Sequence, residues 1–438
     1  MSAEIYDALS RTAQLLRMDV FHSDPEDDHK IIDGLRSTSA RIVANGENLA
    51  CPAAQTALVT LYAQLAMTGL QVELDLPAVN MLVRQPPLRD IGLEEALRDY
   101  SDDLLPGGSS TPTAEPHITF ALGDSPYADA AIRVSGTDTR AVVGPDSSAR
   151  ALRWTGTAPF GGIAAAAAAA TEAARAAVRV IADRLGVEPP AIPAWTSSAV
   201  RCVDIDLQEV ATARKADNDQ VDVVSGGAIT NAMIFTLLRA EEAAGLTLRV
   251  VEPELLDLSN LNRYAMARRS LVNQPKTAAL ASYSGGPAIQ GVPVRVDPDT
   301  ALSLRPWANK VAIGVDDIPS RWLSQREAAA SWVGVGATSH DYVLVSEHLP
   351  DHACAGCTHP RPDETEGPIP TIGFVSLWAG LIMALKLLAA DGATASNGVH
   401  AWPLGLENAR GIDRFVQSPV PNCPVACPAS RRLSRSIM

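Results

Sequence analysis

The stretch from residue 249 to residue 276 concentrates side chains that can bind a nucleotide. Its apolar start ends in Glu252, and Asn260, Arg263 and Lys276 follow. An acid at a strand end can accept hydrogen bonds from ribose hydroxyls, and Arg and Lys supply positive charge to phosphates. Adenylation needs such cations at the phosphates of ATP, whereas hydride transfer does not. The pattern therefore favours adenylation.

The flanking sequence predicts the elements that must hold these side chains. The segment V-V-S-G-G-A-I-T-N at 223–231 predicts a strand that turns at its glycine pair into a helix, which we place at 231–244. Backbone amides at such a turn approach phosphate closely at the helix N-terminus. A second strand at 248–252 brings Glu252 to the same edge, and together these parts make half of a nucleotide-binding α/β unit.

A second acid ends another apolar run, K-V-A-I-G-V-D at 310–316. Ligands of parallel sheets bind at the carboxyl edge, so we expect Asp316 to lie there, to hold Mg²⁺ and to orient ATP. The alternative is that Asp316 is the N-cap of a helix at 317–328. Arg321 is expected to brace this segment and not to touch the substrate.

Four of the six cysteines form two close pairs. The pairs are Cys354 with Cys357 and Cys423 with Cys427. Four thiolates can hold zinc in a tetrahedral site, which is structural because no coordination position remains open. The alternative is four free buried thiols. Cys51 and Cys202 stand alone, as buried packing cysteines usually do.

These motifs resemble those of the ThiF/MoeB superfamily, the adenylating core that is shared with ubiquitin-activating enzymes. The resemblance rests on S-N-L-N-R at 259–263, on the later lysine, on V-D-D-I-P-S-R at 315–321 and on the cysteine pairs, and it covers roughly 215–428. It implies ATP, Mg²⁺ and Zn²⁺ as cofactors. The catalytic residues that it implies are Arg263, Lys276 and Asp316. The nucleotide-binding residues that it implies are Gly226, Gly227, Glu252, Asn260, Arg263, Lys276 and Asp316.

The resemblance also implies the substrate, a carboxylate at the C-terminus of a ubiquitin-like or sulfur-carrier protein or of a peptide precursor. Family members that pass the activated carboxylate to a thiol usually carry that cysteine between the metal pairs, and none lies between Cys357 and Cys423 here. We therefore expect adenylation without an in-chain thioester, with the substrate approaching near 358–372. The chain also departs from the family in its glycine turn, where Ser225 and Thr230 take the outer glycine positions.

The N-terminal half shows the same order of expected strands and helices as the C-terminal half, but without its motifs. Strand-like and helix-like runs follow in the same order, and I-T-F-A-L-G-D at 118–124 places Asp124 opposite Asp316. We predict an α/β fold of two tandem Rossmann-like cores with a four-cysteine zinc site. The degenerate core spans 1–190 and the ATP-binding core spans 191–438. The alternative is that any two α/β domains look this similar.

The resemblance is to the form in which an inactive and an active core are fused. In this superfamily an arginine of the partner core often reaches the ATP phosphates. The candidates in the first half, among which the sequence does not choose, are Arg11, Arg17, Arg36 and Arg41. The active site then needs no second chain, although a homodimer is compatible with the sequence.

Composition excludes several other classes. The 438 residues suffice for two domains with full cores, and 47% hydrophobic residues with 20% charged residues are ordinary for a soluble globular protein. A net charge of −14 argues against a nucleic-acid partner. Residues 1–30 do not resemble a secretory or transit segment. The alanine-rich stretch 164–170 is typical of a closely packed helix and not of a membrane span, so we expect a cytoplasmic protein.

Two other functions stay open at this point. A nicotinamide-dependent oxidoreductase can use the same glycine turn and strand-end acid, but it would leave Arg263, Lys276 and Asp316 without a role. A pseudo-enzyme that binds partner proteins is suggested by Ser225 and Thr230 in the glycine turn. Failure to bind ATP would support the pseudo-enzyme.

Overall fold

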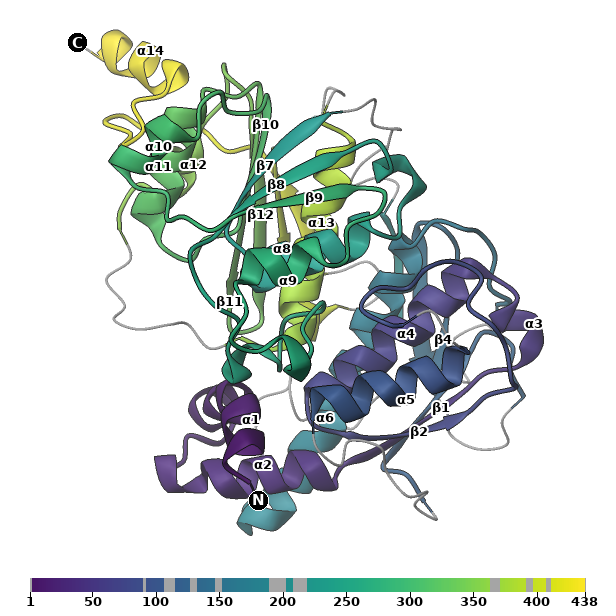
Figure 1. The fold of residues 1–438 in the computed structure, drawn as a ribbon. Coiled ribbons are helices and arrows are strands. Elements are labelled where there is room, and N and C mark those ends of the chain that lie inside the picture. The colour runs from purple at the N-terminus through teal and green to yellow at the C-terminus, as the bar shows by residue number, and fades with distance from the viewer. Residues whose placement is uncertain are drawn as a thin grey trace.

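A computed structural model shows a mixed α/β protein built on two β-sheets (Figure 1). It describes residues 2–89, 92–105, 115–126, 132–145, 152–188, 202–207, 219–362, 371–390, 397–406 and 411–437. The predicted domain boundary at 190/191 and part of the predicted substrate approach, 363–370, lie outside this set. Within the described ranges, no helix is both long enough and apolar enough to cross a membrane.

The first sheet belongs to the N-terminal half. Its strands are β1 (Ser39–Val43), β2 (Gln71–Asp75), β3 (Ile118–Leu122), β4 (Ile132–Gly136), β5 (Arg140–Pro145) and β6 (Val203–Asp206). Their order is β2-β1-β3-β4-β5-β6. The first four run parallel, and β5 and β6 are added antiparallel. Two long helices of this half, α4 (Pro52–Met67) and α6 (Phe160–Leu185), pack against each other.

The second sheet belongs to the C-terminal half. Its strands are β7 (Gln220–Val224), β8 (Thr247–Val251), β9 (Ala288–Val292), β10 (Lys310–Ile313), β11 (Trp332–Ser339), β12 (Tyr342–His348), β13 (Gly398–Ala401) and β14 (Ile412–Phe415). Their order is β14-β13-β12-β11-β10-β7-β8-β9. The strands from β11 to β9 run parallel, and β12 to β14 are antiparallel. Here α8 (Ala228–Leu237) and α13 (Gly373–Leu388) form the packed helix pair.

The two sheets share one strand order. The order β2-β1-β3-β4-β5-β6 corresponds to β8-β7-β10-β11-β12-β13, with the same parallel and antiparallel neighbours, and β9 and β14 are additions to the second sheet. The first sheet extends beyond the predicted boundary at 190/191, because β6 follows that boundary and pairs with β5.

The remaining helices are short or lie at the ends of the chain. They are α1 (Ala3–Leu16), α2 (Asp28–Ser37), α3 (Gly46–Leu49), α5 (Leu93–Leu104), α9 (Lys276–Ala281), α10 (Pro298–Ser303), α11 (Ile318–Ala328), α12 (Ala355–Thr358) and α14 (Pro428–Ile437). Short 3₁₀ turns lie at 25–27, 241–243, 258–260, 269–271 and 403–405, and one π-helical turn lies at 17–21. The N-terminal pair α1 and α2 lies beneath the tip of β11 in Figure 1.

The two halves pack together through helices and side chains. Helix α6 contacts α13, and its alanines at 164–170 are buried, as the sequence predicts for a closely packed helix. Arg175 of α6 donates a hydrogen bond to the Leu404 carbonyl at 2.8 Å. One hydrophobic cluster contains residues of both halves, so the protein has a shared core.

Helix α8 differs from its predicted range of 231–244, because it begins at Ala228 and ends at Leu237. Arg239 follows this end, and its guanidinium bonds to Gln85 Oε1 at 2.8 Å and to the Pro86 carbonyl. These partners belong to the first half. A tertiary contact therefore ends the helix where the local sequence would continue it.

Candidate functional site

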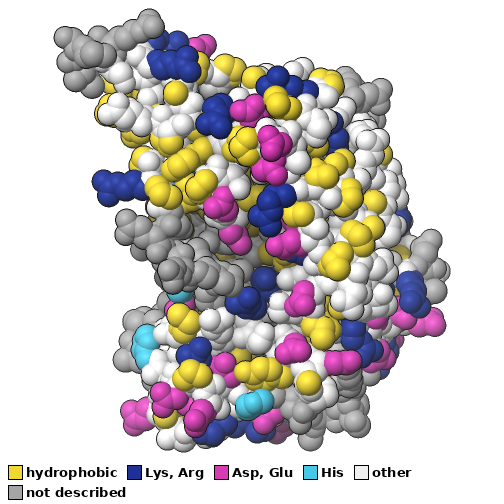
Figure 2. Space-filling model, turned by 60° about the vertical axis from the view of Figure 1, so that its left-hand side comes forward, with side chains coloured by type: hydrophobic (Ala, Val, Ile, Leu, Met, Phe, Trp, Pro, Cys, Tyr) yellow, Lys and Arg dark blue, Asp and Glu magenta, His cyan; other side chains and the backbone are white. Residues whose placement is uncertain are grey.

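A cavity of about 260 Å³ lies at the carboxyl ends of β7, β8 and β10. Its charged and polar lining comprises Arg11, Ser225, Gly227, Glu252, Glu254, Arg263, Tyr264, Lys276, Arg295, Asp316, Asp317, Ser320, Thr338 and Thr371. Five predicted residues meet here: Gly227, Glu252, Arg263, Lys276 and Asp316. Acidic and basic side chains also gather around a hollow on one face of the molecule (Figure 2).

The buried Glu252 carboxylate holds the glycine turn in place. Gly227 is the N-cap of α8, and the Gly226 N–H donates to Glu252 Oε2 at 2.7 Å. A side chain at position 226 would clash with Glu252, so the turn requires glycine there. The other carboxylate oxygen accepts the Glu254 N–H at 3.0 Å. Glu252 is therefore buried and holds the turn, a contact that the sequence did not predict, and Gly226 supports the cavity without lining it.

Ser225 takes a backbone conformation that favours glycine, with φ at 102°. Its Oγ accepts the Gly227 N–H at 2.9 Å. A phosphate bound at the N-terminus of α8 would use this same N–H. The Ser225 hydroxyl therefore already occupies the Gly227 N–H, the backbone amide that we expect to bind a phosphate.

Lys276 is the first residue of α9, and its side chain is only 6% exposed. Its Nζ bonds to Glu254 Oε2 at 2.5 Å. Burial opposes the charged form, but the neighbouring Tyr264 and Glu254 outweigh it, so the pKa of Lys276 is raised. The same hydrogen bond lowers the pKa of Glu254. A fixed positive charge therefore faces the cavity, paired to the Glu254 carboxylate through one hydrogen bond.

Arg263 is held by the motif that carries it. Its Nη1 donates to Asn262 Oδ1 at 2.9 Å and to the Ser259 carbonyl. Burial lowers its pKa from the usual arginine value. Asn260 does not line the cavity, since its side chain accepts the Asp257 N–H at 3.0 Å in a capping box. It fixes the turn on which Arg263 stands.

The first half also contributes a cation. Arg11 of α1 lines the cavity, whereas Arg17 pairs with Asp28 at 2.8 Å and Arg41 pairs with Glu73 at 3.0 Å. Among the four candidate arginines, the cavity lining includes Arg11 and none of the others.

Asp316 and Asp317 have different tasks. The Asp317 carboxylate accepts the Ser320 N–H at 2.7 Å and is the N-cap of α11, so the alternative that Asp316 is the cap does not hold. Asp316 is exposed on the cavity wall, which suits a carboxylate that holds a cation. Arg321 donates to the carbonyls of Val315 at 2.8 Å and Asp316 at 3.4 Å, so it braces this segment.

Sequence reasoning missed several residues of the lining, among them Arg295, Thr338 and Thr371. Arg295 follows β9, which pairs in parallel with β8. The apolar run A-I-Q-G-V-P-V at 288–294 was a usable signal, because parallel neighbours end at the same edge. Thr338 depends on the length of β11, which no local motif announces.

The corresponding edge of the first sheet is filled by its own chain. Residues 44–51 separate β1 from α4, whereas only 225–227 separate β7 from α8. The Asn48 amide nitrogen of this insert donates to Asn45 Oδ1 at 2.9 Å and to Asp124 Oδ1 at 2.7 Å. The Asn48 Oδ1 accepts the backbone N–H of Trp154 at 3.2 Å. Asp124, the counterpart of Asp316, is thus engaged by a buried side chain.

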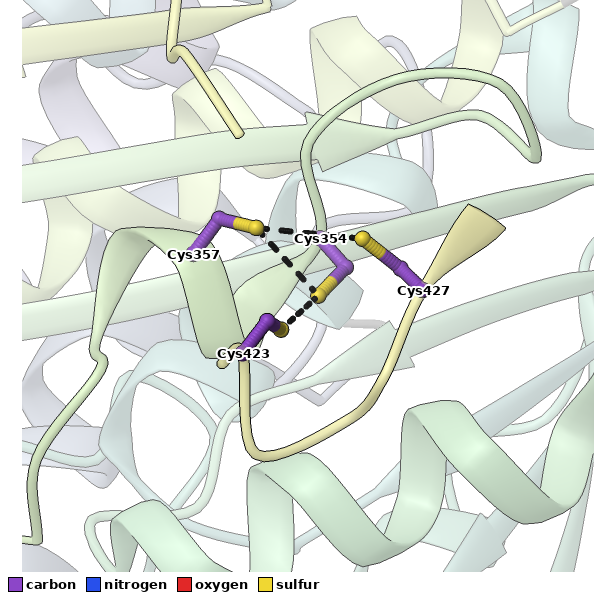
Figure 3. A group of neighbouring side chains, drawn as sticks. All are labelled: Cys354, Cys357, Cys423 and Cys427. Carbon is purple, nitrogen blue, oxygen red and sulfur yellow. Dashed lines mark hydrogen bonds between the residues drawn. The ribbon is translucent and has the colours of Figure 1, made fainter. Parts of the chain in front are cut away.

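The four paired cysteines meet in one buried cluster (Figure 3). Their Sγ atoms all lie within 4.8 Å of one another. The Sγ of Cys357 is 3.8 Å from those of Cys354 and Cys427, and the Sγ atoms of Cys354 and Cys423 are 3.1 Å apart. In a zinc–thiolate tetrahedron with Zn–S bonds of about 2.3 Å, sulfurs lie about 3.8 Å apart. The residues present therefore fit a metal ion.

Two backbone features let the cysteine pairs close. Ala426 has φ at 54° and donates its N–H to the Cys423 carbonyl at 2.8 Å, which folds the wider C-P-V-A-C spacing into a turn. A side chain at Gly356 would lie 2.9 Å from Cys423 Sγ. Hydrogen bonds among the thiols lower the pKa of Cys423 and raise the pKa of Cys354, so one sulfur of the cluster takes the thiolate form at the expense of its neighbour.

Known protein structures align with part of this chain. No protein-family model and no curated protein matches the sequence. Among solved structures, Escherichia coli MccB with succinimide aligns at 14% identity and a TM-score of 0.39 over 48% of this chain and 66% of that chain. The microcin C7 biosynthetic enzyme MccB in complex with N-formylated MccA gives 14% and 0.40 over 49% and 67%. Selenomethionine PaaA gives 12% and 0.36 over 45% and 64%.

The extent of these alignments is limited. They cover about half of this chain, and the chain spans just under two thirds of the length of the MccB structure with succinimide. The likeness concerns the arrangement of helices and strands in that part.

Proposed function

We propose that this protein is an ATP-dependent adenylating enzyme that activates a carboxylate at the C-terminus of a peptide or a small protein. The proposal is supported chiefly by one observation, the convergence of Arg11, Arg263, Lys276 and Asp316 on a cavity whose floor is the N-terminus of α8. These groups come from both halves of the chain.

The chemistry accounts for this set of side chains. A carboxylate oxygen of the substrate forms a bond to the α-phosphorus of ATP, and the bond from that phosphorus to the pyrophosphate oxygen breaks. Negative charge collects on phosphate oxygens, and fixed cations in a partly buried site stabilise it. The Arg263 guanidinium and the Lys276 ammonium supply that charge, and the N-terminus of α8 adds its dipole. The attacking carboxylate is already ionised, so no general base is needed.

Two metal ions belong to the proposal. Asp316 would hold Mg²⁺, which neutralises phosphate charge when it is bound. The cysteine cluster would hold Zn²⁺ in a closed structural site, away from the reacting atoms. The Lys276 ammonium has three N–H donors, so it can contact a phosphate while Glu254 holds it in place.

We further infer that the two sheets are tandem Rossmann-like cores, of which the first has lost its nucleotide site. The common strand order supports this inference, as does the insert that places Asn48 against Asp124. Arg11 then takes the place of the arginine that a partner core supplies to the ATP phosphates when two separate cores assemble.

The test is a calorimetric titration of the full chain with magnesium-ATP and, separately, with NADH. We expect ATP to bind, and Arg263→Ala and Asp316→Ala to weaken that binding about tenfold or more, which corresponds to at least about 1.4 kcal/mol. Arg269→Ala is the matched control, because Arg269 pairs with Glu4 outside the cavity. Pyrophosphate exchange with candidate peptides then tests the reaction itself.

Other outcomes would decide for the alternatives. Binding of NADH without ATP would overturn adenylation in favour of an oxidoreductase. Binding of neither nucleotide would favour a pseudo-enzyme, which the Ser225 hydroxyl on the Gly227 amide also suits.

A further inference from the structure

A cavity of about 420 Å³ lies between the two halves of the chain and shares no lining residue with the nucleotide cavity. One wall belongs to the segment 81–89, which follows β2 in the first half. The other wall is formed by residues of 268–271 and 282–283 in the second half. Pockets that bind small molecules have volumes of about 300–1,000 Å³, so this cavity has room for a small organic ligand.

The charged part of the lining is entirely basic. It comprises Arg84, Arg89 and Arg268, and no described acidic residue lines the cavity. The whole chain has 50 acidic and 36 basic residues, so an all-arginine lining is contrary to its average composition. Guanidinium groups bind carboxylates and phosphates through paired, charge-assisted hydrogen bonds. The lining therefore indicates an anionic ligand.

Neighbouring carboxylates neutralise only part of this charge. Arg268 Nη1 bonds to Asp99 and Asp103, both at 3.1 Å, and Arg89 shares Asp99 at 3.2 Å. The Arg84 guanidinium donates to two backbone carbonyls at 3.2 Å and has no carboxylate partner among the described residues. Three arginines thus face two carboxylates.

A fourth arginine is buried directly behind the first wall. The Arg239 guanidinium donates to Gln85 Oε1 at 2.8 Å and to two backbone carbonyls, and Gln85 itself lines the cavity. All of these partners are neutral, and burial lowers the pKa of Arg239 without an opposing charge. Buried charges are normally paired. Four arginines and two carboxylates leave two positive charges for an anion to neutralise.

Two buried donors next to the cavity lack an acceptor. The Arg268 Nη2 atom and the Tyr283 hydroxyl interact electrostatically, but neither has a hydrogen-bond partner in the described part of the chain. Burial raises the pKa of Tyr283 to about 12, so the hydroxyl keeps its proton at neutral pH. Buried donors without acceptors are unfavourable. An anion against this wall would supply oxygen acceptors once these side chains turn toward it.

The cavity also has an apolar surface. Met81, Pro87, Leu88 and Leu271 contribute it. An inorganic ion would leave this surface in contact with water, whereas an organic anion would cover it and gain affinity from its burial. The lining thus fits a charged group that is carried on an apolar body.

We propose that this cavity binds a small organic dianion, a phosphate monoester or a dicarboxylate, with its charged groups at Arg84 and Arg89 and its apolar body against Leu88 and Leu271. The site is separate from the adenylation chemistry proposed above and does not depend on it. Because its walls come from both halves, the bound ligand stabilises the contact between them.

The test is a calorimetric titration of the full chain at about pH 8, where a phosphate monoester with its second pKa near 6 carries two charges. The probes are phenyl phosphate, phthalate, inorganic phosphate and benzyl alcohol. We expect phenyl phosphate or phthalate to bind about tenfold or more tightly than inorganic phosphate, which has no apolar body. Benzyl alcohol has no charge and should not bind. The dianion that binds more tightly identifies the charged group, and it should raise the melting temperature.

Four variants locate the site. Arg84→Ala should weaken binding of the dianion about tenfold, because a charge-assisted hydrogen bond is lost. Ser282→Phe, at an exposed position of the lining, should weaken it by filling the cavity. Arg98→Ala is the matched control, because the exposed Arg98 pairs with Glu94 outside the cavity. Arg263→Ala changes the nucleotide cavity and should leave this binding unchanged.

The outcomes can be interpreted whether or not the protein binds ATP. Weaker binding in the two cavity variants, with normal binding in the other two, would support the proposal. Binding that is lost in Arg263→Ala and kept in Arg84→Ala would place the anion in the nucleotide cavity and overturn it. Failure of both dianions to bind the wild type would also overturn it. Benzyl alcohol or inorganic phosphate binding as tightly as the dianions would contradict the assigned ligand class.

Discussion

The side-chain amide of Asn262 donates a hydrogen bond to Thr12 Oγ1 at 3.0 Å, and both side chains are almost fully buried. This bond joins the S-N-L-N-R motif to α1 of the other half. Arg11 and Arg263 are each next in sequence to one of its two partners. The bond therefore fixes the relative position of the two arginines that face the cavity from opposite halves.

We expect Thr12→Val to lower the free energy of unfolding by about 1–3 kcal/mol, because the buried Asn262 amide would lose its acceptor. Magnesium-ATP affinity should fall as well, because α1, which carries Arg11, loses the contact that fixes its position on the Asn262 segment. Chemical denaturation and calorimetry measure the two effects. Thr68→Val is the control, because the buried Thr68 hydroxyl donates to the Gln64 carbonyl of its own helix. Equal losses in both variants would argue against a special role for the Asn262 contact.

Arg11→Ala should weaken magnesium-ATP binding about tenfold with little change in stability, because the side chain supplies charge to the cavity and not packing to the core. Arg17→Ala, in which the lost arginine pairs with Asp28 outside the cavity, should bind ATP normally. If both variants weakened binding alike, the docking of α1 would be responsible and not the Arg11 charge.

Ser225→Gly and Ser225→Ala separate backbone strain from the hydroxyl contact. Glycine relieves a positive φ that costs about 1 kcal/mol but loses a hydrogen bond of about the same value, so stability should change little. Alanine keeps the strained φ and loses the bond, so it should destabilise by about 1 kcal/mol. Both variants release the Gly227 N–H and should tighten ATP binding. Unchanged affinity in both would show that the Ser225 hydroxyl does not compete with phosphate.

The Lys276–Glu254 pair predicts a pH dependence of stability. The pKa of Glu254 is lowered, so its contribution is present above the ordinary carboxyl pKa of about 4.3 and is lost as the pH falls through the lowered value. The pKa of Lys276 is raised, so its contribution is present below about 10.4 and is lost as the pH rises through the raised value.

The difference in unfolding free energy between wild type and Glu254→Gln should therefore be largest between about pH 5 and pH 10 and vanish in acid. It should be small, because the Glu254 side chain is 59% exposed and solvent screens the pair. Denaturation curves across this range check the profile. A difference that persisted at pH 3 would have another cause.

The protein should copurify with one zinc ion per chain, bound at the cysteine cluster, and elemental analysis measures this zinc content. Chelation or Cys423→Ser should remove the metal and lower the melting temperature, because a structural site contributes binding energy to the fold. Cys202→Ser should retain the metal, since Cys202 lies outside the cluster. Ala426→Gly should be neutral or stabilising, because φ at 54° favours glycine. A protein free of metal with all four cysteines intact would overturn the zinc assignment.

Five residues that the sequence placed on local motifs line the cavity, Glu252 among them. Gly227, Arg263, Lys276 and Asp316 occupy the ends of elements whose order could be read from apolar runs. Arg11 could not be selected from the sequence, because its position depends on how α1 docks on a motif 250 residues away. The end of α8 was missed for the same reason.

Other residues took roles that their types did not reveal. Glu252 was assigned to ribose from its place at a strand end, but its two oxygens accept the amides of Gly226 and Glu254. Asn260 was assigned to the nucleotide; its side-chain oxygen accepts the Asp257 N–H in the turn beneath Arg263, and it does not line the cavity. In both cases a polar side chain next to the ligand cavity satisfies a backbone amide first, which sequence spacing does not show.

The two sheets share a strand order, a hydrophobic core and a single polypeptide. Arg11 is therefore delivered to the cavity at any dilution, whereas an arginine supplied by a separate subunit would be lost when the subunits dissociate. Covalent linkage also frees the halves from the requirement that both copies of an interface be identical. One sheet can carry a buried asparagine at its edge while the other keeps that edge open, so the two halves can differ at the same place.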